Sequence, residues 1–318
     1  MRARRSNQSP GQPDLGFYPP EGEQGALEID LTSADSPENL RIDIHLGDAE
    51  RILQNLPSES AQVCVTSPPY WGLRDYGLER DVQIGAEEQL DDYVTRLVAV
   101  FQQVRRVLKD DGSLWLNLGD SYTSGNRGWR APDKKNPART MDYRPPTPDG
   151  LKPKDLIGVP WRVAFALQAD GWYLRSDIIW HKPNCQPESV RDRPTQSHEY
   201  LFLLTKSERY YYDADSVLEQ SKDGRALRNR RTVWSIPTEP FPEAHFATFP
   251  PSLVAPCILA GSRRGDTVLD PFFGAGTAGL VAAQHGRSCI GIDVSADYVN
   301  LAFGRMPKDL GTVRIFGS

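Results

Sequence analysis

The stretch that decides the fold reads DPFFGAGTAG and occupies residues 270–279. A short apolar strand pattern, residues 267–269, precedes it, and an apolar helix pattern follows it. Its three glycines fit the spacing GxGxxG, which lets a backbone approach a ligand closely between a strand and a helix. The stretch therefore predicts an α/β sheet with a ligand at this turn, and a tight strand-to-helix turn without a ligand is the alternative.

Strands and helices also alternate before this turn. Residues 41–46 and 61–65 have strand patterns, and residues 90–108 repeat apolar side chains at helical spacing until Asp111-Gly112. Further strands are predicted at 113–118, 172–180, 200–204 and 288–292. Further helices are predicted from Pro160 to Gly171, from Pro250-Pro251 to Gly261 and from the glycine-rich turn to Gly286. This order predicts a parallel α/β architecture.

The domain boundaries follow from composition. Residues 1–38 are rich in Pro, Gly, Ser and Glu and have no apolar period, so we expect a disordered tail. Residues 39–318 form one predicted domain. Two polar, irregular segments interrupt it, 121–157 and 206–244, and both are too long to be mere connections.

Charge and cysteine usage limit the class of protein. The net charge is −5, yet residues 121–240 contain 20 Lys and Arg against 15 Asp and Glu. Such a basic region is what a phosphate backbone attracts, although it also fits a solvated surface. The four cysteines are widely spaced and the five histidines are scattered, so we expect neither a metal site nor disulfides. No apolar run approaches a membrane span and none follows the basic N-terminus, so we expect a cytoplasmic protein.

The glycine-rich turn has two interpretations. With Asp293 at the end of the next strand, it fits a nicotinamide dinucleotide site, where an acidic residue holds ribose hydroxyls. Asp270, however, lies four residues before the first glycine, where a phosphate gains nothing from a carboxylate. S-adenosylmethionine has no phosphate, and its ammonium group suits a carboxylate while its anionic end suits the helix start. The residues therefore favour S-adenosylmethionine.

The stretch Thr66-Ser67-Pro68-Pro69-Tyr70-Trp71 carries the chemistry. An exocyclic base amine is a weak nucleophile because its lone pair is delocalised into the ring. A serine oxygen and a carbonyl followed by proline can accept its two N–H bonds and favour a tetrahedral nitrogen. The aromatic ring of Tyr70 can stack on a base turned out of the duplex. A strand-ending turn with a core aromatic is the structural alternative.

These motifs resemble those of the amino-methylating DNA methyltransferases of the permuted β order, in which the catalytic tetrapeptide precedes the cofactor turn. The segment His245–Pro251 is similar to the family's motif before that turn. The stretches Trp180–Asn184, Asp192-Arg193 and His198–Tyr200 resemble its middle block. The resemblance covers residues 40–303 and implies a doubly wound, Rossmann-like sheet in circularly permuted order with a small irregular recognition insert.

The resemblance also implies roles for single residues. The catalytic residues would be Ser67, Pro68, Pro69 and Tyr70. The cofactor-binding residues would be Asp48 at the adenine ring, Asp293 at the ribose, and Thr66, Asp270, Phe272, Gly274, Gly276 and Thr277. Serine at position 67 favours cytosine N4 over adenine N6 as the methylated atom. Double-stranded DNA is the implied partner, and whether a restriction endonuclease accompanies the chain stays open.

The same residues also bear on several alternative functions. The chemistry also suits RNA or a protein glutamine, and the basic region together with Trp71 favours nucleic acid without separating DNA from RNA. No catalytic constellation supports a nicotinamide oxidoreductase, and the intact tetrapeptide speaks against an inactive DNA-binding protein. Pro256-Cys257 matches the Pro-Cys of carbon-5 cytosine methyltransferases, but it lies inside an apolar helix before the cofactor turn, where a thiol is inert.

The DNA-reading surface is assigned to the irregular segments 121–157 and 206–244, because the core elements are occupied with catalysis. The second segment contains four arginines, Arg225, Arg228, Arg230 and Arg231. The alternative is that these arginines contact phosphates only.

Overall fold

The computed structural model describes residues 40–73, 83–124, 128–129, 144–221, 224–239, 249–307 and 311–317. The expected tail, residues 1–38, lies outside the described residues. Parts of the two irregular segments also lie outside them, as does most of the expected motif at 245–251. No helix in the described part of the chain is long and apolar enough to cross a membrane.

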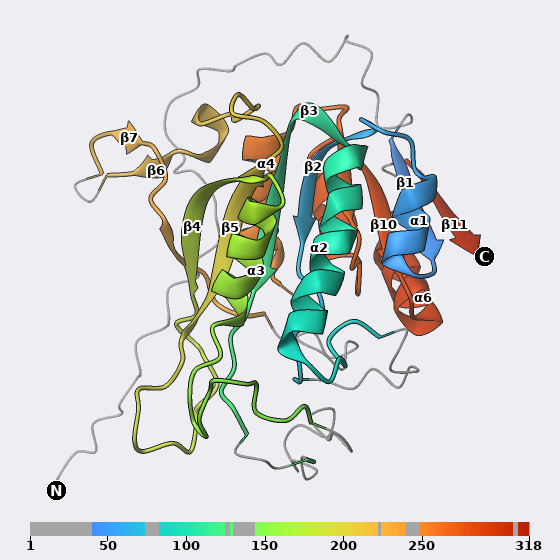
Figure 1. The fold of residues 1–318 in the computed structure, drawn as a ribbon. Helices are drawn as coiled ribbons and strands as arrows, with labels where there is room; N and C mark the ends of the chain where they lie inside the picture. Colours follow the sequence, from blue (N-terminus) through green and yellow to red (C-terminus); the bar gives the residue numbers. More distant parts are fainter. Residues whose placement is uncertain are drawn as a thin grey trace, which may run out of the picture. The chain divides into compact units, whose positions relative to one another are not determined.

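Strands of the described residues form one nine-stranded sheet in the order β11-β1-β10-β9-β2-β3-β5-β4-β8 (Figure 1). The strands are β1 (Arg41–Leu46), β2 (Ala61–Thr66), β3 (Leu108–Leu118), β4 (Tyr173–His181), β5 (His198–Thr205), β8 (Val233–Ser235), β9 (Thr267–Asp270), β10 (Ser288–Asp293) and β11 (Thr312–Gly317). The late strands β9 and β10 lie between the early strands β1 and β2. The permuted α/β architecture predicted from the sequence is therefore confirmed.

One strand departs from the expected parallel arrangement. β5 is antiparallel to both of its neighbours, β3 and β4, whereas the other neighbours in the sheet are parallel. Residues 182–197 join β4 to β5 without a crossover helix. A direct connection of this kind returns the chain alongside itself, so β5 must run antiparallel to β4.

Helices cover both faces of the sheet. They are α1 (Ala49–Asn55), α2 (Leu90–Val107), α3 (Val159–Ala169), α4 (Pro251–Gly261), α5 (Thr277–Gln284) and α6 (Ala296–Arg305). The first three pack in one buried apolar cluster, and the last three pack in another. Side chains of β3 alternate between the two, with Leu114 and Leu116 in the first and Trp115 in the second. This is a doubly wound sheet.

Several elements differ from the sequence prediction. The helix expected at 90–108 ends at Val107, and β3 begins at Leu108 rather than at residue 113, because the register with β2 shifts between Ala61 and Val63. The helices α1 and α6 and the strand β11 were not predicted. Residues 206–244 are not irregular throughout, since they contain β8, the short 3-10 helix η3 (Asp215–Val217) and a hairpin of β6 (Glu219–Gln220) and β7 (Leu227–Arg228).

Candidate active site

The carboxyl ends of β2 and β9 bring the two sequence motifs together. The strands are neighbours, with Val63 beside Val268. At their ends, the hydroxyl of Thr66 donates a hydrogen bond of 2.6 Å to Oδ1 of Asp270. Because open α/β sheets bind ligands outside the carboxyl ends of their strands, this edge is the candidate active site.

The glycine-rich turn has the backbone that close approach requires. Gly274 and Gly276 have φ of +51° and +77°, which L-residues rarely adopt. A Cβ on Gly276 would also lie 2.7 Å from Cε of Met306. Thr277 begins α5 and is buried, and its Oγ1 lies 3.5 Å from the guanidinium of Arg305. The turn therefore delivers the N-terminus of α5 to the carboxyl edge, where its first N–H groups lack intrahelical partners.

Three predicted acidic residues lie at the ends of adjacent strands: Asp270 ends β9, Asp293 ends β10, and Asp48 follows β1. In the register, Asp293 pairs with Leu46 and Asp270 pairs with Gly291, so the strand ends are aligned. Asp293 accepts backbone N–H bonds of 2.8 Å from both Gly274 and Ser295. This carboxylate therefore links the cofactor turn to the end of β10.

Two further predicted cofactor residues lie beside the turn. The side chain of Asp48 accepts from the backbone of Arg51 at 3.0 Å and caps α1. The ring of Phe272 is partly buried, and its edge meets Phe101 with ring centroids 6.5 Å apart. The fold thus brings the predicted cofactor-binding residues to one edge.

Asp270 is electrostatically unusual. Its side chain is fully buried, and burial raises its pKa to about 7 against the opposing effect of hydrogen bonds from Thr66 and the Phe272 N–H. Its second oxygen, Oδ2, has no hydrogen-bond partner among the described residues. A buried, unpaired carboxylate oxygen is costly, so this atom fits a ligand that brings a cationic donor.

Hydrogen bonds with α2 and with the segment before it hold the tetrapeptide Ser67–Tyr70 and the adjacent Trp71 in place. The carbonyl of Pro69 accepts a bond of 2.9 Å from the hydroxyl of Tyr93 on α2. Trp71 is 4% exposed, and its indole N–H donates to the Glu87 carbonyl at 2.9 Å. The Trp71 ring is therefore part of the core behind the tetrapeptide.

The hydroxyl of Tyr70 lies at the centre of a polar network. It accepts from the hydroxyl of Ser67 at 3.3 Å and donates to Oε2 of Glu199 at 2.8 Å. The amide of Asn117 lies 3.2 Å from both that hydroxyl and that carboxylate. Lys182 makes an ion pair with the other carboxylate oxygen of Glu199. Three side chains thus hold the hydroxyl of Tyr70, and Lys182 holds one of them, Glu199.

Sequence reasoning missed the roles of Asn117, Lys182 and Glu199. Lys182 and Glu199 were noticed only as parts of the middle block. The sequence alone gives no signal for the pairing of Lys182 with Glu199, because that pairing depends on the register of the hairpin, in which His181 pairs with His198. Side chains next to such a pair reach the same edge of the sheet.

The comparison with known families decides the class of enzyme. A family model described as DNA methylase, N6_N4_Mtase, matches residues 61–304. The chain belongs to this DNA methylase family. Type II methyltransferase M.Cfr9I of Citrobacter freundii is 62% identical over 270 residues, covering 85% of this chain and 89% of that protein. Type II methyltransferase M.SmaI of Serratia marcescens is 60% identical over 280 residues, covering 87% and 95%.

Solved structures share the fold of this methylase. TTHA0409 of Thermus thermophilus, in complex with S-adenosyl-L-methionine, aligns with a TM-score of 0.61 at 23% identity, over 87% of this chain and 98% of that one. The PvuII DNA methyltransferase, described as cytosine-N4-specific, aligns with a TM-score of 0.63 at 20% identity, over 84% and 87%. At these identities the likeness concerns the fold.

Cys257 is not a nucleophile of this methylase. Its side chain is buried in α4, its thiol donates to the Leu253 carbonyl at 3.2 Å, and burial raises its pKa well above the ordinary value. A thiol in that state is inert. The rejection of carbon-5 chemistry is therefore confirmed.

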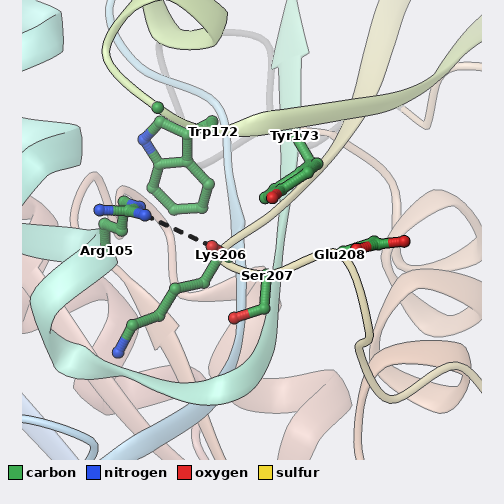
Figure 2. Close-up of a pocket in the computed structure, with 7 residues that line it drawn as sticks. Arg105, Trp172, Tyr173, Lys206, Ser207 and Glu208 are labelled. Atoms are coloured by element: carbon green, nitrogen blue, oxygen red, sulfur yellow. Dashed lines mark hydrogen bonds between the residues drawn. The ribbon is translucent and has the colours of Figure 1, made fainter.

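A pocket of the methylase lies at the opposite, amino edge of the sheet (Figure 2). Trp172 and Tyr173 at the start of β4 line it, together with residues that follow β5. Arg105 of α2 also lines it and donates to the Lys206 carbonyl at 3.4 Å. Because this pocket lies at the other end of the strands, it is separate from the tetrapeptide and the cofactor turn.

The two irregular segments occupy different edges. Residues 121–157 connect the carboxyl end of β3 to α3, and of their described part Pro145 lies against Gly72, two residues after the tetrapeptide. Residues 206–232 follow β5, which ends at the amino edge, and lead into β8, which runs parallel to β4 and returns to the carboxyl edge at Ser235. The arginine-bearing hairpin of β6 and β7 therefore joins the sheet at the amino edge (Figure 1).

Proposed function

We propose that this methylase transfers a methyl group from S-adenosylmethionine to the exocyclic N4 of cytosine at a specific site in duplex DNA. The observation that carries the proposal is the hydrogen bond between Thr66, which precedes the tetrapeptide, and Asp270, which opens the cofactor turn. It holds a base-binding loop and a cofactor-binding turn against each other. Methyl transfer needs donor and acceptor aligned within about 3–3.5 Å, and this junction provides a fixed frame for both.

The cofactor fits the residues at the edge. The unpaired oxygen of Asp270 suits its ammonium group, and the N-terminus of α5 suits its carboxylate. Asp293 is assigned to the ribose and Asp48 to the adenine ring. The structural neighbour TTHA0409 was solved with S-adenosyl-L-methionine, which supports the same cofactor here. When bound, the cofactor supplies an electrophilic methyl group on sulfur.

The tetrapeptide is assigned to the base. Ser67 Oγ and the carbonyl of Pro68 accept the two amine N–H bonds, since the carbonyl of Pro69 is already bonded to Tyr93. Accepting both bonds directs the nitrogen lone pair towards the methyl group. Tyr70 stacks on the base, which offsets part of the unstacking cost of a few kcal/mol.

Cytosine is favoured over adenine by two observations. Serine occupies position 67, where aspartate or asparagine would favour adenine. The fold is also shared with PvuII methyltransferase, which is described as cytosine-N4-specific. Adenine N6 is the second candidate, since the matching family bears both names.

DNA reading is assigned chiefly to residues 121–157 and to the end of the second segment after β8. In their described parts, Ile157 is bonded to Ser121 after β3 and Thr238 is bonded to Asn184 after β4. These residues adjoin the carboxyl edge, where a base must enter the site. The relatives M.Cfr9I and M.SmaI are Type II methyltransferases, and we propose that this chain likewise protects DNA beside a restriction endonuclease.

Product analysis tests the function. The protein is incubated with labelled S-adenosylmethionine and unmethylated plasmid DNA, with single-stranded RNA in a parallel reaction. The nucleic acids are digested to nucleosides, and the labelled one is identified by mass spectrometry. We expect N4-methylcytosine from DNA and no label in RNA. N6-methyladenine would overturn the base assignment, and label in RNA alone would overturn the substrate class.

A further inference from the structure

We propose that Ser67, Tyr70 and Glu199 form a proton relay that carries the proton lost by the methylated amine to the carboxylate of Glu199. The inference rests on the proposed function, because it concerns the amine that the tetrapeptide holds. It assigns a task to Glu199 that stacking of Tyr70 on the base does not require.

Amine methylation releases a proton that must leave the site. As the N–CH3 bond forms, the S–CH3 bond breaks, and S-adenosylhomocysteine departs with the electron pair. The nitrogen then carries two protons and a positive charge, and it becomes a neutral secondary amine only when one proton leaves. An acceptor at hydrogen-bond distance speeds such a step.

A continuous chain of hydrogen bonds leads away from the amine site. Ser67 donates to the Tyr70 hydroxyl at 3.3 Å, and Tyr70 donates to Glu199 Oε2 at 2.8 Å. The amine proton moves to Ser67 Oγ as the serine proton moves to Tyr70 Oη and the tyrosine proton moves to Glu199. One proton leaves the substrate and one arrives on Glu199, so the charges balance, and both hydroxyls end as they began.

Glu199 is the acceptor at the end of this chain because its neighbours keep it ionised. Burial raises its pKa, but the charge of Lys182 and hydrogen bonds from Lys182, Tyr70 and Asn117 outweigh that effect and lower the pKa below its ordinary value. The other acceptor of the Tyr70 hydroxyl, the amide oxygen of Asn117 at 3.2 Å, is too weakly basic to keep a proton. Glu199 is 17% exposed, which allows the proton to pass to solvent.

Tyr70 is also held rigidly enough to pass a proton. A Cβ on Gly119 would lie 2.6 Å from Cε2 of the Tyr70 ring, so the ring occupies the space that a side chain there would fill. Gly119 on one side and the bond of the hydroxyl to Glu199 on the other therefore set the position of the ring. Glu199 acts through Tyr70, so it is a positioning residue and proton acceptor that does not itself touch the base.

The test separates the ring of Tyr70 from its hydroxyl. Single-turnover methylation of plasmid DNA is measured for the wild type, Tyr70→Phe, Glu199→Gln and the double variant, in water and in heavy water. Asp266→Asn is the control, because the Asp266 carboxylate is paired with Lys109 at 2.8 Å at the amino edge, away from the relay. Cofactor affinity, the melting temperature and the fluorescence of 2-aminopurine placed at the target base are recorded for every variant.

We expect Tyr70→Phe and Glu199→Gln each to slow methyl transfer by about 100-fold and to lose the solvent isotope effect of the wild type. The double variant should be no slower than either single one, because both interrupt one relay. Cofactor affinity and 2-aminopurine fluorescence should stay at wild-type values, and Asp266→Asn should keep the wild-type rate. Tyr70→Phe leaves the Lys182–Glu199 pair intact, so it gives a result even if Glu199→Gln does not fold.

A wild-type rate in Tyr70→Phe, or in folded Glu199→Gln, would overturn the relay while leaving the proposed function in place. Independent, additive losses in the two single variants would also overturn it. Failure of the wild type to methylate DNA would instead overturn the proposed function.

Discussion

The two edges of the central sheet contain similar residues in different settings. At the carboxyl edge, polar side chains are buried and bonded to specific partners, as in Thr66 with Asp270 and Glu199 with Lys182. At the amino edge, ion pairs have a member in solvent. Lys109, which pairs with Asp266 at 2.8 Å, is 42% exposed.

The setting of the polar side chains helps to distinguish a candidate active site from an ordinary surface in this fold. Burying a polar group is costly unless it is bonded. Arg287 at the amino edge is also buried, but it is bonded to Ser262 and His285, whereas Asp270 at the carboxyl edge keeps an oxygen without a partner among the described residues. Exposed ion pairs contribute little to stability and hold no special geometry. The pocket at the amino edge, beside Arg105 and Trp172, contains none of the residues that are assigned to the cofactor or the base.

The largest effect is expected at the first residue of the tetrapeptide. Ser67→Ala removes an acceptor that acts on the amine in the transition state, so turnover should fall by about 10²–10³-fold with cofactor affinity unchanged. Ser207→Ala, in the amino-edge pocket, is the control and should match the wild type. Steady-state methylation and isothermal titration with the cofactor measure the two quantities. Wild-type turnover in Ser67→Ala would show that this oxygen has no catalytic role.

A second substitution displaces Tyr70 without changing it. The Cβ of Gly119→Ala would lie 2.6 Å from the Tyr70 ring, which must move. Misplacement by about 1 Å can cost about 100-fold in rate, so turnover should fall between about 10-fold and 100-fold. Gly304→Ala is the matched control, because a Cβ there meets nothing within 4 Å and alanine favours a helix. Equal turnover in the two variants would contradict the packing of the ring against Gly119.

The third expectation concerns pH. The pKa of Asp270, about 7 in the cofactor-free protein, is raised above the ordinary value, so the carboxyl is protonated below that pH. Binding an ammonium group requires the ionised form. Cofactor affinity should therefore fall as pH drops below 7, by up to about tenfold per unit.

Titration calorimetry between pH 5.5 and 8.5 checks this linkage. Asp270→Asn should bind weakly and without the dependence on pH, while Asp266→Asn at the amino edge should keep it. If the wild type binds the cofactor with constant affinity below pH 7, Asp270 is not the partner of the cofactor's ammonium group.

The smallest effects are expected from the arginines of the amino edge. Arg228 and Arg231 share the carboxylate of Glu219, at 3.1 and 2.8 Å, and Arg230 lies over the Trp234 ring. We expect Arg228→Ala and Arg231→Ala each to reduce the slope of the logarithm of the DNA-binding constant against the logarithm of salt concentration by about one or less. The preference for particular bases should stay unchanged. Binding is measured at two salt concentrations on the methylated site and on single-base variants. A relaxed preference at one base pair would place base reading at the amino edge.

Much of this molecule follows from its sequence. The end of β2 before Pro68 and Pro69 and the glycine-rich turn after β9 were predictable, because each depends on residues that are close together in the sequence. The Glu199–Lys182 pair was not, because it depends on the register of a hairpin across sixteen residues. The helix α1 was missed because it is seven residues long and buries only Ala49 and Leu53. The edge strand β11 was missed because its side chains are mostly exposed, which leaves no clear alternation.

The most direct test of the account is a photochemical cross-link at the target base. The target cytosine of the methylated site is replaced by 5-iodocytosine, the complex with the cofactor product is irradiated, and the linked peptide is identified by mass spectrometry. We expect a cross-link to the peptide that contains Tyr70, at the carboxyl edge. A cross-link to a peptide from residues 206–232, at the amino edge, would contradict it.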